Sequence, residues 1–222
     1  MKKNATVLSL CLLIVMLTTF NPNNLNSGFQ FFKIKQIEVK NLSFLEKKKI
    51  ENQFFNELYD SSLFILDGKK IKKILNNNNF INYLEFKKIF PAKLQIFVYE
   101  KEAIAILNDK QDKYYLTENG EKIKFFKNQN SDKLPNIFGK QKNFLNIYSS
   151  LTKISFPISK IKSFYYFDVG RWDILLKDKK VIKLPVKNFD ISLRNFMDIY
   201  EEINFEKYTI FDYRIADQLI LK

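Results

Sequence analysis

An alternating stretch, residues 93–100, constrains the fold of this 222-residue chain more than any other feature. It reads KLQIFVYE, and its apolar positions include Leu94, Ile96 and Val98. Successive side chains of a β-strand point to opposite faces, so the pattern predicts a strand that buries one face. A second predicted strand, residues 81–90, precedes it across Pro91, which lies outside the ladder and needs no donor. Two neighbouring strands joined by a short turn are therefore expected.

Two helices are predicted before these strands. The first covers residues 44–58, where Ser43 and Glu46 have capping-box spacing. Its apolar stripe at helical spacing consists of Ile50, Phe54 and Leu58. A shorter helix begins after Asp67 as N-cap and stops at the asparagine run 76–79. With a short strand at 34–39, the order is strand, helix, helix, strand, strand.

Composition excludes most familiar site chemistry. The formal net charge is +13, but the lysines are spread along the whole chain, which predicts a solvated basic surface and no nucleic-acid partner. Histidine is absent and Cys11 is the single cysteine, so Ser-His-Asp triads, Cys-His dyads and His/Cys metal sites are excluded. We therefore predict no catalytic residue, no metal site and no cofactor.

One acid pair remains as a candidate reaction centre. Glu100 and Glu102 are two residues apart, which on a continuing strand places both carboxylates on one face. Paired acids can share acid/base work, but lysines flank this pair and no Gly-rich or polar pocket signal lies near it. We interpret the pair as part of the architecture and not as a reaction centre.

The amino terminus carries a membrane-directed signal. Lys2 and Lys3 precede an apolar run over roughly residues 5–20. Such a run is a signal peptide or an anchor; at about 24 Å it is short for a hydrocarbon core of about 30 Å. The following TTFNPNNLNSGF lacks an A-x-A-like cleavage site, which favours an uncleaved anchor over 5–21. The lysines then hold a stub, 1–4, in the cytoplasm, and the linker 22–32 leads to exported domains.

The motifs resemble the FtsQ/DivIB family of bacterial cell-division proteins. Residues 32–105 carry IEV, LFILD, FPAKLQIFVYE and KEAIA, which are similar to the POTRA domain of that family. Four later segments follow in the family's order: YYLTENGEKI (114–123), GRWDILLKDKKVIKLP (170–185), LRNFMDIYEEI (193–203) and IFDYRIADQLIL (210–221). Ala103 stands where the family usually has proline, and Thr117 where it has an acid.

The resemblance implies an α+β fold behind a single amino-terminal transmembrane helix. A POTRA domain, 33–100, with the order β-α-α-β-β is expected first. An FtsQ-type β domain, 101–222, built on an antiparallel sheet with helices near 141–152 and 190–203, is expected to follow. Trp172 is predicted to anchor the core of that domain.

The function implied by the resemblance is scaffolding without catalysis. Such a protein crosses the cytoplasmic (inner) membrane once and uses periplasmic domains to gather division proteins, chiefly FtsB and FtsL, at the septum; it has no small-molecule substrate. A strand at 215–222 is expected to form an open sheet edge that accepts a partner strand. The expected partner-binding residues are Arg171, Arg214, Ile215, Asp217, Gln218, Leu219 and Leu221.

Two functions from other classes stay open on the sequence. An anchored periplasmic enzyme acting on cell-wall polymer requires separated acids that converge in a cleft. A basic module that docks on the anionic cell envelope requires lysines clustered on one face. The arrangement of side chains in space distinguishes these classes from a scaffold.

Overall fold

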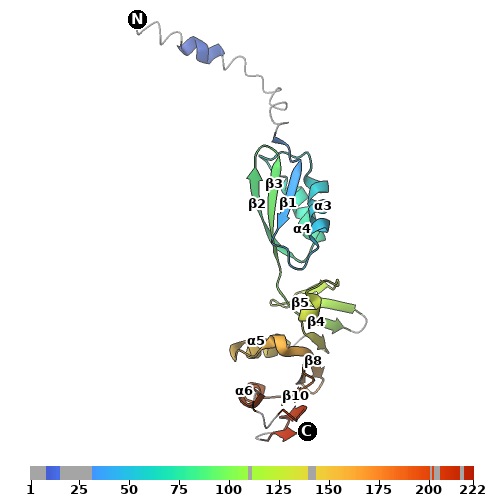
Figure 1. Cartoon of the computed structure of the whole chain (residues 1–222). Helices are drawn as coiled ribbons and strands as arrows, with labels where there is room; N and C mark the ends of the chain where they lie inside the picture. The colour runs from blue at the N-terminus through green and yellow to red at the C-terminus, as the bar shows by residue number, and fades with distance from the viewer. Residues whose placement is uncertain are drawn as a thin grey trace. The chain divides into compact units, whose positions relative to one another are not determined.

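The computed structural model describes residues 9–15, 32–109, 112–139, 144–200, 202, 206–215 and 218–222. Contacts divide the chain into two compact units, Met1–Tyr99 and Glu100–Lys222, which we term the first and second units (Figure 1). Residues 9–15 are helical. Within the described segments, no helix has the length and apolar character required to cross a membrane. The predicted anchor, 5–21, lies mostly outside those segments.

The first unit is a three-stranded sheet covered by two helices. Its elements are β1 (Gln36–Lys40), α3 (Lys47–Leu58), α4 (Gly68–Asn77), β2 (Ile81–Ile89) and β3 (Lys93–Glu100). The strand order is β1-β3-β2, and β1 runs parallel to β3. The order of elements is the one that the sequence predicts.

The alternating strand lies at the centre of this sheet and buries the expected face. Leu94, Ile96 and Val98 are fully buried. They share one core with the α3 stripe, Ile50, Phe54 and Leu58, and with Ile74 of α4. Figure 1 shows α3 and α4 on the same side of the sheet. The apolar stripe of the helix and the buried face of the strand, which the two periodicities predict, therefore pack in a single core.

The expected capping box is wrong, whereas the second cap is confirmed. α3 begins at Lys47 with Glu46, not Ser43, as N-cap, and the Glu46 side chain makes no capping hydrogen bond. The preceding residues 43–45 form a bend, and the Phe44 ring packs on Phe80 with centroids 5.1 Å apart. Tertiary packing thus overrides the local pattern. At α4, Asp67 Oδ1 accepts a hydrogen bond from the Lys69 amide at 2.8 Å, as the sequence predicts.

The second unit contains a nine-stranded sheet with the order β12-β11-β10-β9-β8-β7-β4-β5-β6. Its strands are β4 (Ala103–Asp109), β5 (Asp112–Thr117), β6 (Lys122–Lys124), β7 (Asn136–Phe138), β8 (Ile161–Phe167), β9 (Arg171–Leu176), β10 (Val181–Lys183), β11 (Ile210–Asp212) and β12 (Ile220–Leu221). Two helices accompany the sheet, α5 (Phe144–Lys153) and α6 (Phe189–Tyr200), close to the positions expected.

The sheet is mixed, so the expectation of an antiparallel sheet is wrong for three strand pairs. β4 pairs parallel with β7, β7 with β8, and β10 with β11. α5 connects β7 to β8 and α6 connects β10 to β11. A helical crossover returns the chain to the starting end of the sheet, so the next strand runs in the same direction. The sequence shows both helices but not which strands they bring together.

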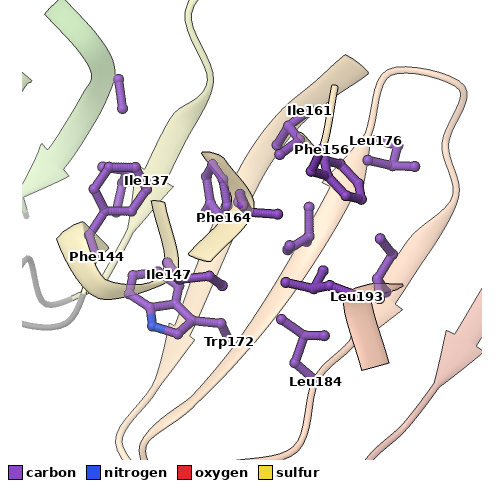
Figure 2. Close-up of a cluster of buried hydrophobic side chains, with 14 of the residues drawn as sticks. Ile137, Phe144, Ile147, Phe156, Ile161, Phe164, Trp172, Leu176, Leu184 and Leu193 are labelled. Atoms are coloured by element: carbon purple, nitrogen blue, oxygen red, sulfur yellow. The ribbon is translucent and has the colours of Figure 1, made fainter. Parts of the chain in front are cut away.

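One face of this sheet forms the core of the second unit (Figure 2). Pairing aligns a row of buried residues across the strands: Leu107, Ile137, Phe164, Ile174, Ile182 and Phe211. Phe144 and Ile147 of α5 and Leu193 and Phe196 of α6 belong to the same cluster. Trp172 is also buried in it, which confirms its expected role as a core anchor.

Candidate functional site

The nine-stranded sheet ends at two edge strands, β12 and β6. β6 carries Lys122 and Lys124 on either side of the buried Ile123. Charged lysines on an edge oppose the addition of another strand. β12 presents Ile220 and Leu221 instead. The chemistry of the side chains therefore makes β12 the edge suited to accept a partner strand.

The hydrogen bonds of β12 fix which of its amides point outward. Ile210 and Lys222 exchange two backbone bonds, Ile210 N to Lys222 O at 2.9 Å and Lys222 N to Ile210 O at 3.1 Å. Bonded and non-bonded pairs alternate along an antiparallel ladder. Leu221, which pairs opposite Phe211, is therefore in a non-bonded pair, and its N–H and C=O point away from β11.

The edge strand is shorter than the sequence predicts. A strand was expected over 215–222, but β12 covers only Ile220–Leu221. The Arg214 amide donates to Asp212 Oδ1 at 3.1 Å, so the backbone leaves the ladder after β11. The Gln218 amide donates to Ile215 O at 3.3 Å, a bond between residues three apart that a continuous strand does not make. Local hydrogen bonds thus replace pairing over this segment.

An open groove of about 670 Å³ lies beside this closing segment. Three parts of the chain line it: the connection between β10 and α6, the first turns of α6, and the residues around 213–219. Its walls include the exposed apolar residues Val186, Ile191 and Ile215, of which Ile191 is 64% exposed. Tyr213 OH donates to Asn195 Oδ1 at 2.9 Å and ties the closing segment to α6. The groove is therefore apolar in part and held in shape.

Arg214 lines the groove but is already engaged within the chain. Its Nε donates to Asp212 Oδ1 at 2.8 Å and its Nη2 to Asp212 Oδ2 at 2.6 Å, a forked pair. These bonds lower the pKa of the buried Asp212 carboxyl. The Arg214 side chain remains 43% exposed, which leaves room for a second, charge-assisted contact.

Arg171 lies two strands away and does not line the groove. Its Nε donates to Asp173 Oδ1 at 3.1 Å, and its guanidinium lies 4.3 Å from the Phe167 ring centroid. Burial raises the pKa of Asp173, while the charges of Arg171, Lys183 and Arg214 lower it. The two arginines are thus linked through carboxylates on the face opposite the core.

The structure gathers part of the predicted partner-binding set. Arg214, Ile215, Gln218 and Leu219 line one groove, and Leu221 lies on the edge next to it. Asp217 is outside the described residues. The sequence reasoning missed Val186, Ile191 and Asn195, which come from a segment about 25 residues upstream. The available signal was an isoleucine, Ile191, in the first turn of the helix predicted over 190–203.

The acid pair that the sequence singled out does not form a constellation. Glu102 is exposed and Glu100 is half-buried at the end of β3. Between them, Lys101 forms an ion pair with Glu121 at 2.6 Å. In the described parts of the chain, no group of three or more His, Cys, Asp or Glu side chains is placed to hold a metal.

A second hollow shows that some lysines do cluster. It has a volume of about 390 Å³ and lies in the second unit. Its lining includes Lys113, Lys127, Lys162 and Lys177, together with one acid, Asp132. All four lysines are exposed to solvent. The basic character of this surface is local, and the groove beside β12 contains only Lys187 and Arg214 as cations.

Two family models match the chain. Residues 32–101 match the POTRA domain, FtsQ-type, and residues 105–214 match Cell division protein FtsQ/DivIB, C-terminal. The chain is similar to Cell division protein FtsQ of Rickettsia bellii, with 28% identity over 178 residues, 78% of this chain and 64% of that protein. It is also similar to Cell division protein DivIB of Bacillus subtilis, with 24% identity over 197 residues, 83% of this chain and 72% of that protein.

A solved structure, the major extracytoplasmic domain of DivIB from Geobacillus stearothermophilus, aligns with 49% of this chain and 98% of its own. Its identity of 14% and TM-score of 0.33 are too low to carry an argument. The match to the Rickettsia bellii protein spans 64% of that relative's length, so the activity and partners of a whole relative do not transfer directly.

Proposed function

Because this chain belongs to the FtsQ/DivIB family of cell-division proteins, we propose that it is a non-enzymatic scaffold that recruits other division proteins to the septum. The proposed partners are FtsB-like and FtsL-like proteins. They bind the second unit on the periplasmic side of the cytoplasmic membrane. A single amino-terminal anchor holds the chain there, with its amino end in the cytoplasm.

One observation carries this proposal: an uncharged edge strand, β12, lies next to a partly apolar groove. An extended partner segment adds to β12 through backbone hydrogen bonds and places side chains in the groove. Each added backbone bond contributes about 0.5–1.5 kcal/mol net. Because β12 is only two residues long, backbone pairing alone gives little affinity. The groove residues Ile191 and Ile215 must supply much of the rest.

Proline at residue 221 tests strand addition. Leu221→Pro removes an outward N–H that only a partner strand uses, and proline is tolerated on edge strands. We expect about a two- to tenfold loss of affinity for an FtsB-like partner, since one backbone bond contributes about 0.5–1.5 kcal/mol and each 1.4 kcal/mol is a factor of about ten. The affinity is measured by titration of the full chain with the partner from the same cell.

Two matched variants control this experiment. Leu221→Ala shortens the side chain but keeps the N–H, so it separates the loss of packing from the loss of the backbone bond. Ile220→Pro removes an amide that faces β11, so it is expected to lower fold stability before binding. Equal binding by Leu221→Pro and Leu221→Ala would exclude strand addition at β12.

Substitution in the groove tests whether partner side chains bind there. Ile191→Asp places a charge on a wall residue that is exposed in the free protein, so the fold should be unaffected. We expect weaker partner binding because the apolar contact is lost and a charge is desolvated. Ile191→Leu retains the apolar surface and serves as the control. Unchanged binding by both variants would place the interface away from the groove.

Membrane anchoring is tested on the mature protein in its own cell. Amino-terminal sequencing is expected to find the chain intact, and the chain is expected to stay with the membrane after alkaline carbonate washing. A mature start between residues 21 and 30 would instead identify a cleaved signal peptide.

A further inference from the structure

Three aromatic rings pack together on the first unit, and the exposed Ile65 follows one of them in the chain. We term these residues the apolar tip: Phe32, Phe64, Ile65 and Phe90. The ring centroids of Phe32 and Phe64 lie 4.9 Å apart, and those of Phe64 and Phe90 lie 5.2 Å apart. The cluster joins the residue that enters the unit, the loop before α4 and the turn between β2 and β3.

The apolar tip is more exposed than a folding role explains. Ile65 is 78% exposed, Phe90 51% and Phe64 43%. Hydrogen bonds nevertheless hold it in place: the Leu63 amide donates to Phe32 O at 2.8 Å, and Lys88 Nζ donates to Phe64 O at 2.5 Å. A fixed and contiguous apolar patch on a soluble surface marks an interaction site.

Three lysines lie at or beside the apolar tip. Lys88 contacts it directly, and Lys70 Nζ donates to Ser61 Oγ at 2.9 Å in the same loop region. Lys33, next to Phe32, forms an ion pair with Asp60 at 2.8 Å. Apolar side chains flanked by lysines suit the boundary between lipid headgroups and acyl chains, where the rings insert and the ammonium groups stay among anionic headgroups.

The position of the apolar tip in the chain favours a membrane as its partner. Phe32 belongs to the tip and follows the proposed anchor, 5–21, by eleven residue steps. An extended chain covers about 3.3–3.6 Å per residue, so this distance is at most about 40 Å. The tip therefore remains near the bilayer at high effective concentration, and even a weak affinity suffices for contact.

We propose that the apolar tip inserts into the headgroup region of the anionic bilayer that holds the chain. This inference rests on the proposed anchor, but it concerns a separate surface. Insertion of Phe64, Ile65 and Phe90 orients the first unit on the membrane. The partner-binding edge of the second unit takes no part in it.

A fluorescent label that reports lipid contact tests this proposal. Cys11 is the single native cysteine, so Cys11→Ser gives a background in which Ile65→Cys carries one environment-sensitive dye. Asn82→Cys is the matched position, because it is exposed on β2 and lies eight strand residues, about 27 Å, from Phe90. Each full-length labelled chain is reconstituted into phosphatidylethanolamine–phosphatidylglycerol liposomes that carry nitroxide-labelled lipids.

Lipid nitroxides are expected to quench the dye at residue 65 several-fold more than the dye at residue 82. Quenching at residue 65 should fall in added salt and in phosphatidylcholine liposomes. A blue-shifted dye at residue 65 without lipid quenching would mean that protein covers the tip, either residues 22–31 or a second copy, and would overturn the proposal. An unshifted, unquenched dye would overturn it as well.

The same dye on native Cys11 separates this proposal from the anchor. Quenching at Cys11 without quenching at residue 65 would support the membrane anchor and overturn the insertion of the apolar tip. If the dye on Cys11 is not quenched, the proposed membrane anchor is wrong. Quenching of the dye at residue 65 by added vesicles then still tests whether the apolar tip inserts. Phe64→Ser should reduce quenching at residue 65, whereas Tyr83→Ser, which removes an equally exposed ring from β2, should not.

Discussion

The two edges of the nine-stranded sheet differ in chemistry although both end the same hydrogen-bonded ladder. β6 places lysines on both sides of Ile123, whereas β12 presents Ile220 and Leu221 beside a groove. Leu221 pairs opposite Phe211, a core residue, while Ile123 lies outside the core cluster. One edge therefore carries charges, and the other is uncharged and packs against the core.

The largest expected effect is the removal of core support from the β12 edge. Phe211 is fully buried and meets Phe196 of α6 edge-on, with centroids 4.9 Å apart. Phe211→Ala should lower the free energy of unfolding by about 3–5 kcal/mol. Ile123→Ala, at the other edge, should cost no more than about 2 kcal/mol, the lower end for such a truncation. Denaturant unfolding measures both, and equal losses would contradict the difference in core support.

Neutralising the charges on β6 should make the two edges alike. Lys122→Val together with Lys124→Val removes the charges that oppose strand addition and raises β propensity. We expect this variant to self-associate at concentrations where the unchanged chain is monomeric, as judged by analytical ultracentrifugation. Lys122→Arg with Lys124→Arg keeps the charge and should behave like the unchanged chain. Self-association of the arginine variant would show that charge does not protect this edge.

The ion pair next to β12 should make stability depend on acid. The folded-state pKa of Asp212 is lowered by Arg214 from its ordinary value of 3.8. The unfolded state therefore binds more protons in that window, so this contribution is present above about pH 4 and is lost as pH falls through the lowered pKa. Asp212→Asn should reduce the acid-induced loss of unfolding free energy, measured by denaturation at several pH values. An unchanged acid slope would contradict this role.

The smallest effect is expected at the ion pair next to β6. Lys122 Nζ lies 3.2 Å from Asp109 Oδ2, and both side chains are well exposed. Exposed pairs contribute little, so Asp109→Asn should change the free energy of unfolding by no more than about 0.5 kcal/mol. Thermal melts of this variant and of Asp212→Asn at neutral pH provide the comparison. A larger loss for Asp109→Asn would mean that the charged edge is structurally supported after all.

The candidate site was partly predictable from the sequence. The closing motif pointed to Arg214, Ile215, Asp217, Gln218, Leu219 and Leu221. Asp217 is outside the described residues, and the other five lie in the groove or on the edge strand. Arg171 was grouped with them, but it lies on β9 outside the groove. On the opposite wall, Val186 and Ile191 lie between two recognised motifs, whereas Asn195 lies within LRNFMDIYEEI, which predicted a helix and not a site. A site formed by segments distant in sequence requires knowledge of which segments pack together.

The sequence by itself determined the local elements. Alternation at 93–100, the stripe of α3 and the Asp67 cap depend on periodicity and on hydrogen bonds within a few residues, which the residue types specify. The family motifs likewise lie within short segments, and the family models match them.

The tertiary structure decided three things that local signals leave open. It set the start of α3, because Phe44 packs on Phe80 rather than continuing a helix. It made the large sheet mixed: α5 and α6 return the chain before β8 and β11, and β7 pairs parallel with β4 after the strands β5 and β6. It formed the groove beside a two-residue β12. Each depends on contacts between residues far apart in sequence, whose free energy is set by packing of the whole unit and not by any one segment.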